Sequence, residues 1–191
     1  MSRFQYLRLK SQAMVLLVFG QRAAALQRFD AMLALAPDDR YALGSLAHVR
    51  VQLGDKAGAI EALRRLVAVH PDHAAAWFNL GYLLDDTGLK AEAEASFRQA
   101  THIEPKMDRA WYGLALILIH ERRFDEAVEA LRHNTQLQPM SPYGWYQLAR
   151  VHADRHEPDE AVKIIRHLRG FEPKVAAQLE RETGLRIAPS A

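Results

Sequence analysis

The sequence predicts an all-α fold built from repeated pairs of antiparallel helices, and three observations carry this prediction. Five prolines recur at a spacing of 34 residues, at Pro37, Pro71, Pro105, Pro139 and Pro173. Small and large apolar residues recur in the same register. No stretch alternates apolar and polar residues as a half-buried strand does. Since the chain has only eight prolines, five at one fixed spacing indicate a repeated structural unit.

The prolines divide the chain into repeats. Each is expected to end a helical segment, because proline lacks the amide donor and restricts the residue before it. We place five repeats at residues 6–39, 40–73, 74–107, 108–141 and 142–175. Residues 1–5 form a short lead, a capping helix is expected over 176–184, and residues 185–191 are expected to be a loose tail.

Two positions of every repeat hold a small residue, which predicts a close crossing of two helices. The eighth position holds Ala13, Ala47, Gly81, Ala115 and Ala149, and the twentieth holds Ala25, Ala59, Ala93, Ala127 and Ala161. A larger side chain at the crossing would force the helices apart. The turn between the helices has Gly20, Gly54 or Gly88 in the first three repeats, which suits a left-handed C-cap. Arg122 and His156 take this place in the last two repeats, so less standard turns are expected there.

One full repeat, residues 74–107, has the frame Trp77, Leu80, Gly81, Leu84, Gly88, Ala93, Phe97, Ala100 and Pro105. This frame resembles the tetratricopeptide repeat (TPR), a helix–turn–helix unit of the same length. The resemblance implies a right-handed α-solenoid, the TPR superhelix, in which stacked repeats bury a continuous core. It also implies a non-catalytic module that binds other proteins as an adaptor, scaffold or assembly factor.

In the TPR family the first helix of each repeat lines a concave groove. Carried onto this chain, the resemblance implies that a peptide or helix of a partner contacts Phe78, Asn79, Tyr82, Arg109, Tyr112, Leu116, Tyr143, Tyr146 and Arg150. Aromatic side chains with polar ends are frequent anchors of such interfaces. Asn79 and Arg109 match two positions of a clamp for a C-terminal carboxylate, whereas Gly113 and His48 depart from it. Asp85 and Asp86 would oppose a highly acidic ligand, so a mixed-charge peptide is expected.

Repeat one differs from the others. It has Leu9 at the position of tryptophan and Gln12 where other repeats have leucine. Met14, Leu17 and Val18 fall on positions that line the groove in the TPR family, and exposed apolar surface marks contact sites. We therefore expect a second contact there, covered by a partner, by a second copy of the chain or by the N-terminal residues. A structural homo-oligomer that packs through repeat one is one alternative function.

The N-terminal residues leave a further alternative open. Basic residues, a short apolar run at 13–20 and an Ala-Ala-Ala sequence have features of a secretory signal, although Arg22 and the repeat register oppose it. A periplasmic or membrane-associated assembly protein, or a secreted one, is therefore the alternative to a cytoplasmic location. The absence of cysteine fits a reducing compartment. No apolar run approaches the length of about 18 residues that a transmembrane helix needs.

Enzymatic, metal-binding and nucleic-acid-binding functions are not predicted. His152 and His156 have a chelating spacing, but one is core-facing, the other lies in a turn, and no third ligand is near. No phosphate-binding glycine loop or nucleophile elbow occurs, so no catalytic residue and no cofactor are expected. The net charge is +2 and basic residues are interleaved with acidic ones, so nucleic acid is not an expected partner.

Overall fold

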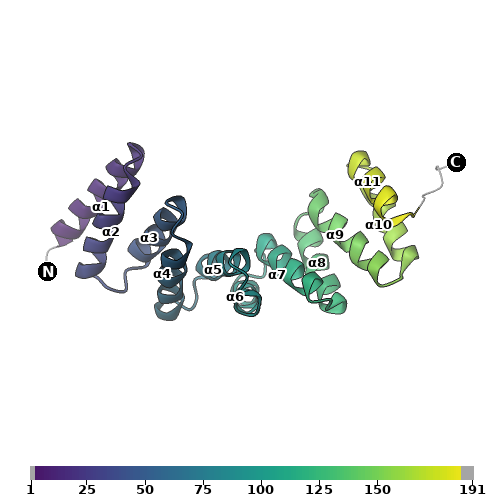
Figure 1. Cartoon of the computed structure of the whole chain (residues 1–191), viewed down its shortest axis with the longest axis horizontal. Helices are drawn as coiled ribbons and strands as arrows, with labels where there is room; N and C mark the ends of the chain where they lie inside the picture. The colour runs from purple at the N-terminus through teal and green to yellow at the C-terminus, as the bar shows by residue number, and fades with distance from the viewer. Residues whose placement is uncertain (1–2, 186–191) are drawn as a thin grey trace. The chain divides into compact units, whose positions relative to one another are not determined.

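The computed structural model describes residues 3–185, and within that range the chain is a succession of eleven α-helices without a strand (Figure 1). The helices are α1 (Arg3–Val18), α2 (Arg22–Leu35), α3 (Arg40–Gln52), α4 (Lys56–Val69), α5 (Ala74–Asp86), α6 (Lys90–Ile103), α7 (Asp108–His120), α8 (Phe124–Leu137), α9 (Pro142–Asp154), α10 (Pro158–Arg169) and α11 (Pro173–Thr183). Helices α1 to α10 form five successive pairs along the chain, and α11 follows them.

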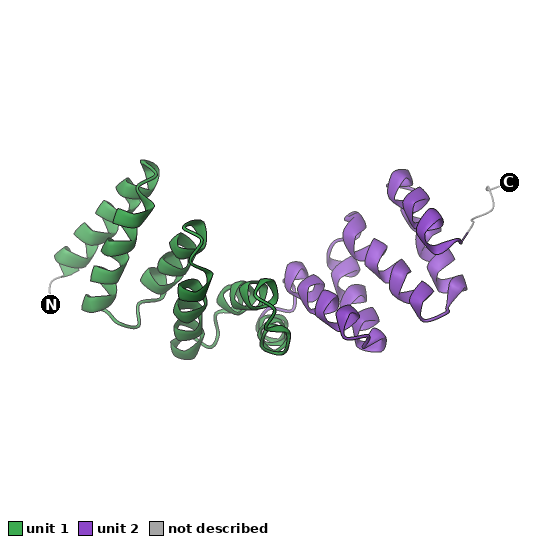
Figure 2. Cartoon of the chain, in the orientation of Figure 1, with its two compact units in different colours: residues 1–103 green, residues 104–191 purple. Residues whose placement is uncertain are grey.

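The chain divides into two compact units, residues 1–103 and residues 104–191 (Figure 2). In unit 1, each helix from α1 to α5 packs against the helix that follows it in the chain. In unit 2, the same holds for α7 to α10, and α11 also packs against α9. Each helix therefore buries its apolar face against its sequence neighbours, which is the packing of a repeat array.

The small residues lie where two helices of a repeat approach most closely. Ala13, Ala25 and Ala93 are fully buried. A Cβ atom placed on Gly81 of α5 would lie 2.9 Å from a ring carbon of Phe97 and 3.2 Å from the carbonyl oxygen of Ala93 on α6. This contact explains why the eighth position of this repeat is glycine.

The turns within the repeats share one backbone conformation. Gly20, Gly54 and Gly88 have φ angles of 69°, 82° and 83°, in the left-handed region that glycine adopts without strain. Arg122 and His156 occupy the same place with φ of 60°. The expectation of less standard turns in the last two repeats was therefore wrong for the backbone, because the turn geometry overrides the residue preference.

Some helix bounds differ from the predicted frame. Helix α1 already begins at Arg3, inside the predicted lead. Pro173 begins α11, three residues before the predicted start of the capping helix, since proline is well tolerated in the first turn of a helix. Leu179 of α11 is fully buried while Gln178 and Glu182 are exposed. Apart from Leu185, the predicted tail lies outside the described residues.

Candidate protein-binding site

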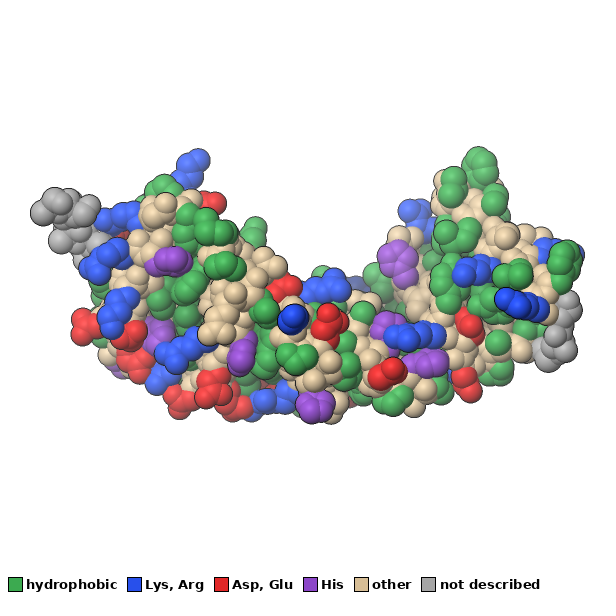
Figure 3. Space-filling view, turned by 180° about the vertical axis from the view of Figure 1, so that it is seen from behind, with side chains coloured by type: hydrophobic (Ala, Val, Ile, Leu, Met, Phe, Trp, Pro, Cys, Tyr) green, Lys and Arg blue, Asp and Glu red, His purple; other side chains and the backbone are tan. Residues whose placement is uncertain are grey.

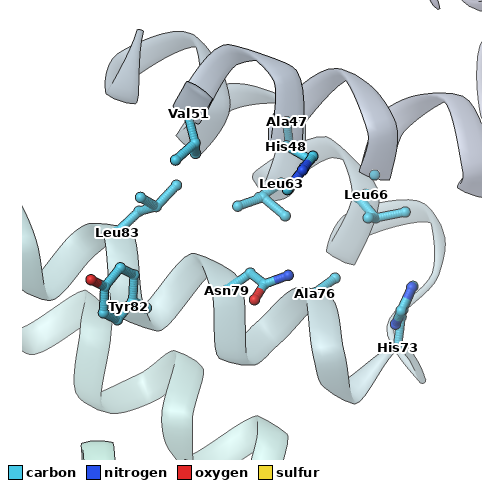
Figure 4. A pocket seen from close by; sticks show the side chains of 11 residues that line it. Ala47, His48, Val51, Leu63, Leu66, His73, Ala76, Asn79, Tyr82 and Leu83 are labelled. Carbon is cyan, nitrogen blue, oxygen red and sulfur yellow. The ribbon is translucent and has the colours of Figure 1, made fainter. Parts of the chain in front are cut away.

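A pocket of about 210 Å³ opens in unit 1 between α3, α4 and α5 (Figure 4). Its lining residues are Gly44, Ala47, His48, Val51, Leu63, Leu66, His73, Ala76, Asn79, Tyr82 and Leu83. In the close view, the side chains of Leu63 on α4 and Asn79 on α5 lie between α3 and α5. The pocket is thus an apolar hollow with four side chains that have polar groups.

Local interactions hold the helices around the pocket. Asp39 caps α3 by accepting a hydrogen bond from the amide of Ala42 at 2.7 Å. The hydroxyl of Tyr6 on α1 donates to the same carboxylate at 2.7 Å, and burial together with this bond raises the pKa of Tyr6. On α3 and α5, the small Ala47 and Ala76 are both buried in the pocket wall and leave the space between the helices open.

His73 lies at the start of α5 and lines the pocket. Burial lowers its pKa, and the nearby Arg40 guanidinium acts in the same direction. The neutral imidazole is therefore favoured in the folded protein. His48 lies across the pocket on α3, where its Nε2 is 2.9 Å from the side-chain nitrogen of Gln52.

The three predicted site residues of α5 have different environments. Tyr82 is 60 % exposed and Asn79 is also exposed, and both line the pocket. Phe78 is half-buried, with its ring centroid 6.0 Å from that of Phe97, so it contributes to the packing of α5 on α6. The other lining residues, Val51 and His73 among them, are not predicted site residues. His73 precedes its helix, so a rule based on the first helix of each repeat misses it.

The two acidic residues that follow on α5 are paired with lysines. Asp86 lies 2.5 Å from the ammonium group of Lys56, and Asp85 is paired with Lys90. The two lysines therefore partly neutralise the negative charge of Asp85 and Asp86. The predicted opposition to an acidic ligand is weaker than the sequence suggests.

The other predicted site residues lie in unit 2, on α7 and α9. Arg109 is exposed, and Tyr112 and Leu116 are half-buried at spacings that place them on one face of α7. On α9, Tyr143 is 70 % exposed. Tyr146 donates its hydroxyl to Glu182 of α11 at 2.5 Å, which raises the pKa of the phenol. The guanidinium of Arg150 lies 5.9 Å from the Tyr146 ring centroid. Tyr146 therefore also holds α11 in place.

The predicted second contact lies on α1. Met14 and Val18 are exposed, whereas Leu17 is half-buried. The hydroxyl of Tyr41 lies 3.1 Å from the sulfur of Met14, and the ammonium of Lys10 lies 4.0 Å from the centroid of the same ring. Repeat two therefore covers only part of this surface.

The histidine pair considered for metal binding is separated by its environment. His152 is buried and its Nδ1 lies 2.7 Å from a carboxylate oxygen of Glu157. This hydrogen bond lowers the pKa of Glu157, with Arg155 contributing. His156 is exposed in the turn. Residues 3–185 contain no group of three or more His, Asp or Glu side chains arranged to hold a metal ion. Over the same residues, no helix has the length and apolar character to cross a membrane.

Comparison with known structures agrees with this architecture. The chain superposes on a MamA protein with a TM-score of 0.79 and 20 % identity, covering 97 % of this chain and 98 % of that one. YrrB, described as a TPR protein with an unusual peptide-binding site, gives a TM-score of 0.77 and 17 % identity, covering 88 % of each chain. A TPR protein from Parabacteroides merdae gives 0.80 and 17 %, covering 94 % of this chain and 74 % of that one.

Sequence comparisons point to the same family. No curated protein sequence matches the chain significantly. Two family models, both described as tetratricopeptide repeat, match residues 45–107 and 88–145. Together they span residues 45–145, which is more than half of the 191-residue chain. The chain belongs to the tetratricopeptide-repeat family.

Proposed function

We propose that this protein is a non-catalytic interaction module that binds a peptide or helix of a partner protein at the α3–α5 face of unit 1. The observation that carries the proposal is the pocket between Ala47 and Ala76, with exposed Asn79 and Tyr82 beside it. An apolar hollow receives a side chain of the partner, and nearby amide and hydroxyl groups bond its backbone or polar groups.

The size of the pocket favours a peptide over a small metabolite. Pockets for drug-sized ligands measure about 300–1,000 Å³. The volume of about 210 Å³ suits one large apolar side chain. The apolar wall formed by Val51, Leu63 and Leu83 has no charged group for an ionic substrate. We therefore expect the partner segment to carry one leucine, methionine or aromatic anchor.

Further contacts are proposed in unit 2. Arg109, Tyr112 and Leu116 on α7 offer a cation and two partly exposed apolar groups. Tyr143 and Arg150 on α9 offer another exposed set. The peptide-binding site for which YrrB is described supports a similar use of this fold. An adaptor, scaffold or assembly factor in the cytoplasm is the role that we propose.

The test combines capture with direct binding. Wild-type protein is used to capture partners from the native lysate, and a peptide from a captured protein is then titrated in fluorescence anisotropy. Asn79→Ala with Tyr82→Ala should lower the affinity for that peptide at least about tenfold, since two interface contacts are removed. Leu89→Ala is the matched control, because Leu89 is also exposed but lies in the α5–α6 turn outside the pocket.

The outcomes are separable. Equal binding by wild type and the double variant would contradict the proposed site and move the interface to α1 or to another face. If wild type retains only further copies of itself, the homo-oligomer becomes the favoured function. Loss of binding together with a lowered melting temperature would require the milder Tyr82→Phe, which keeps the ring and should keep most of the affinity.

A further inference from the structure

A large apolar surface lies on the outward face of α1, within unit 1 and apart from the pocket. Thirteen large hydrophobic residues are exposed in the described chain, and six of them fall between positions 4 and 19. These six are Phe4, Leu7, Met14, Val15, Val18 and Phe19, with exposed fractions between 46 % and 80 %. Figure 3 shows hydrophobic side chains gathered at the upper right, where α1 ends and α2 begins.

Helical geometry places four of these residues on one side of α1. Phe4, Leu7, Met14 and Val18 are separated by three, seven and four residues, so they follow a single stripe of the helix. The opposite side carries Leu9 and Ala13, which are buried in unit 1. Helix α1 therefore has apolar residues on both sides; one side is buried in the fold, and the other stays largely exposed apart from the contact of Met14 with Tyr41.

The surroundings of this stripe are basic. Residues 1–29 contain Arg3, Arg8, Lys10, Arg22 and Arg28 and no Asp or Glu. Residues 1–35 therefore hold five basic side chains and one acidic one, a formal charge of +4. The remaining residues hold 20 basic and 22 acidic side chains, a formal charge of −2. The positive charge of the protein is thus concentrated on the helix pair that carries the exposed apolar stripe.

The arginines are placed to flank the stripe. With 3.6 residues per turn, Arg3 falls beside Leu7 and Met14 on one edge, and Arg8 falls beside Val15 on the other. Both arginines are exposed. An exposed apolar surface bordered by arginines can enter a membrane interface that contains anionic headgroups. The long arginine side chains then reach the headgroups while the apolar face enters the acyl boundary.

We propose that α1 docks this protein peripherally on a membrane surface that carries anionic lipids. A second copy of the chain fits the same surface less well. Two copies of α1 have no carboxylate between them to pair with Arg3 and Arg8. Anionic headgroups supply the missing negative charge. The inference does not depend on the α3–α5 pocket.

Vesicle sedimentation tests the proposal with the 191-residue chain. Vesicles of phosphatidylcholine alone are compared with vesicles of equal parts phosphatidylcholine and phosphatidylglycerol. We expect at least about tenfold more bound protein on the anionic vesicles, and we expect salt to reduce that binding by screening. Val18→Ser with Phe19→Ser should abolish it. Leu53→Ser with Leu89→Ser changes two exposed residues of unit 1 that lie in turns outside the pocket; it is the matched control and should bind as wild type.

A second pair of variants tests the charge. Arg3→Gln with Arg8→Gln should reduce binding to anionic vesicles at least about fivefold. Arg166→Gln with Lys174→Gln removes the same charge from exposed positions of unit 2 and should leave binding unchanged. The pocket variant with Asn79→Ala and Tyr82→Ala should also bind vesicles normally, which separates this proposal from the peptide site.

Three results would overturn the proposal. One is no sedimentation with anionic vesicles by wild-type protein. Another is equal loss in the test and control variants. The third is a wild-type dimer in light scattering that Val18→Ser with Phe19→Ser converts to a monomer while vesicle binding persists, because this would assign the surface to a second copy.

Discussion

The indole nitrogen of Trp77 donates a hydrogen bond to the carbonyl oxygen of Pro71 at 2.9 Å. The same bond, at the same length, joins Trp111 to Pro105 and Trp145 to Pro139. Each tryptophan is the fourth residue of its repeat, and each proline lies near the end of the repeat before it. The bond therefore links consecutive repeats, which is a physical reason for the common register of tryptophan and proline.

Trp111→Phe should lower the free energy of unfolding by about 1–2 kcal/mol, because it removes one hydrogen bond and reduces ring contact. Trp111 loses its bond to Pro105 and part of its stacking on His133, whose ring centroid is 4.3 Å away. Urea denaturation measures the change. Tyr143→Phe is the control, since Tyr143 is an exposed aromatic residue whose replacement should be neutral. Equal stability of both variants would show that the repeat junction does not need this bond.

The periodic features of the fold were predictable from the sequence, because the same residue types recur at the same positions of successive repeats. The paired helices, the small residues at the crossing and the glycine turns all follow from the 34-residue register. Gly81 illustrates this, since the contact of its backbone with Phe97 is what the small residue predicts. The turns at Arg122 and His156 show the opposite case, where position in the repeat was the better guide than residue type.

The candidate site was only partly predictable. The tyrosine at position 82 follows from the groove positions of the family, but the pocket beside it forms from three helices. Ala47 belongs to the repeat frame by sequence, and it forms a wall of the pocket together with Ala76 only in three dimensions. Likewise, no local pattern links Tyr146 to Glu182, which lies 36 residues further along the chain.

Arg122→Gly should stabilise the protein by about 0.5–1 kcal/mol, since a non-glycine residue is strained at positive φ. His156→Gly should have a similar effect, because both residues have φ of 60°. The urea midpoint measures the gain. Glu121→Gly, one residue earlier and in the ordinary right-handed region, is the control and should destabilise. A loss of stability in Arg122→Gly would indicate that the contact of its guanidinium with Phe124, 6.0 Å from the ring centroid, outweighs the backbone strain.

Gly144→Ala should destabilise unit 2 by about 1–3 kcal/mol through overpacking. A Cβ atom at this position of α9 would lie 2.1 Å from the amide oxygen of Asn134. Asn134 is buried and donates to the carbonyl of Asp108 at 2.9 Å, so moving it away disturbs a hydrogen bond between α8 and α7.

Gly44→Ala is the matched control for that exchange. The nearest atom to a Cβ there is a methyl carbon of Leu66 at 3.8 Å, an ordinary contact. Alanine is also the better helix former by about 1 kcal/mol, so this variant should be neutral or more stable. Thermal melts of the two single variants decide the comparison. A similar melting temperature for both would contradict the close approach of Asn134 to Gly144.

The stability of the protein should fall as the pH is lowered from neutral, and His73 should carry part of this effect. Burial lowers the pKa of His73 in the folded chain, whereas an unfolded chain has a value of about 6.5. Between these two values the unfolded state binds more protons, so lowering the pH favours unfolding. The contribution of neutral His73 to stability is complete above the pKa of the unfolded chain and is lost as the pH falls through the lower pKa of the folded chain.

Urea midpoints measured between about pH 7.5 and about pH 5.5 should therefore decrease in wild type and decrease less in His73→Gln. If His73→Gln and wild type share one slope, the imidazole at the pocket is not held in its neutral form by the fold.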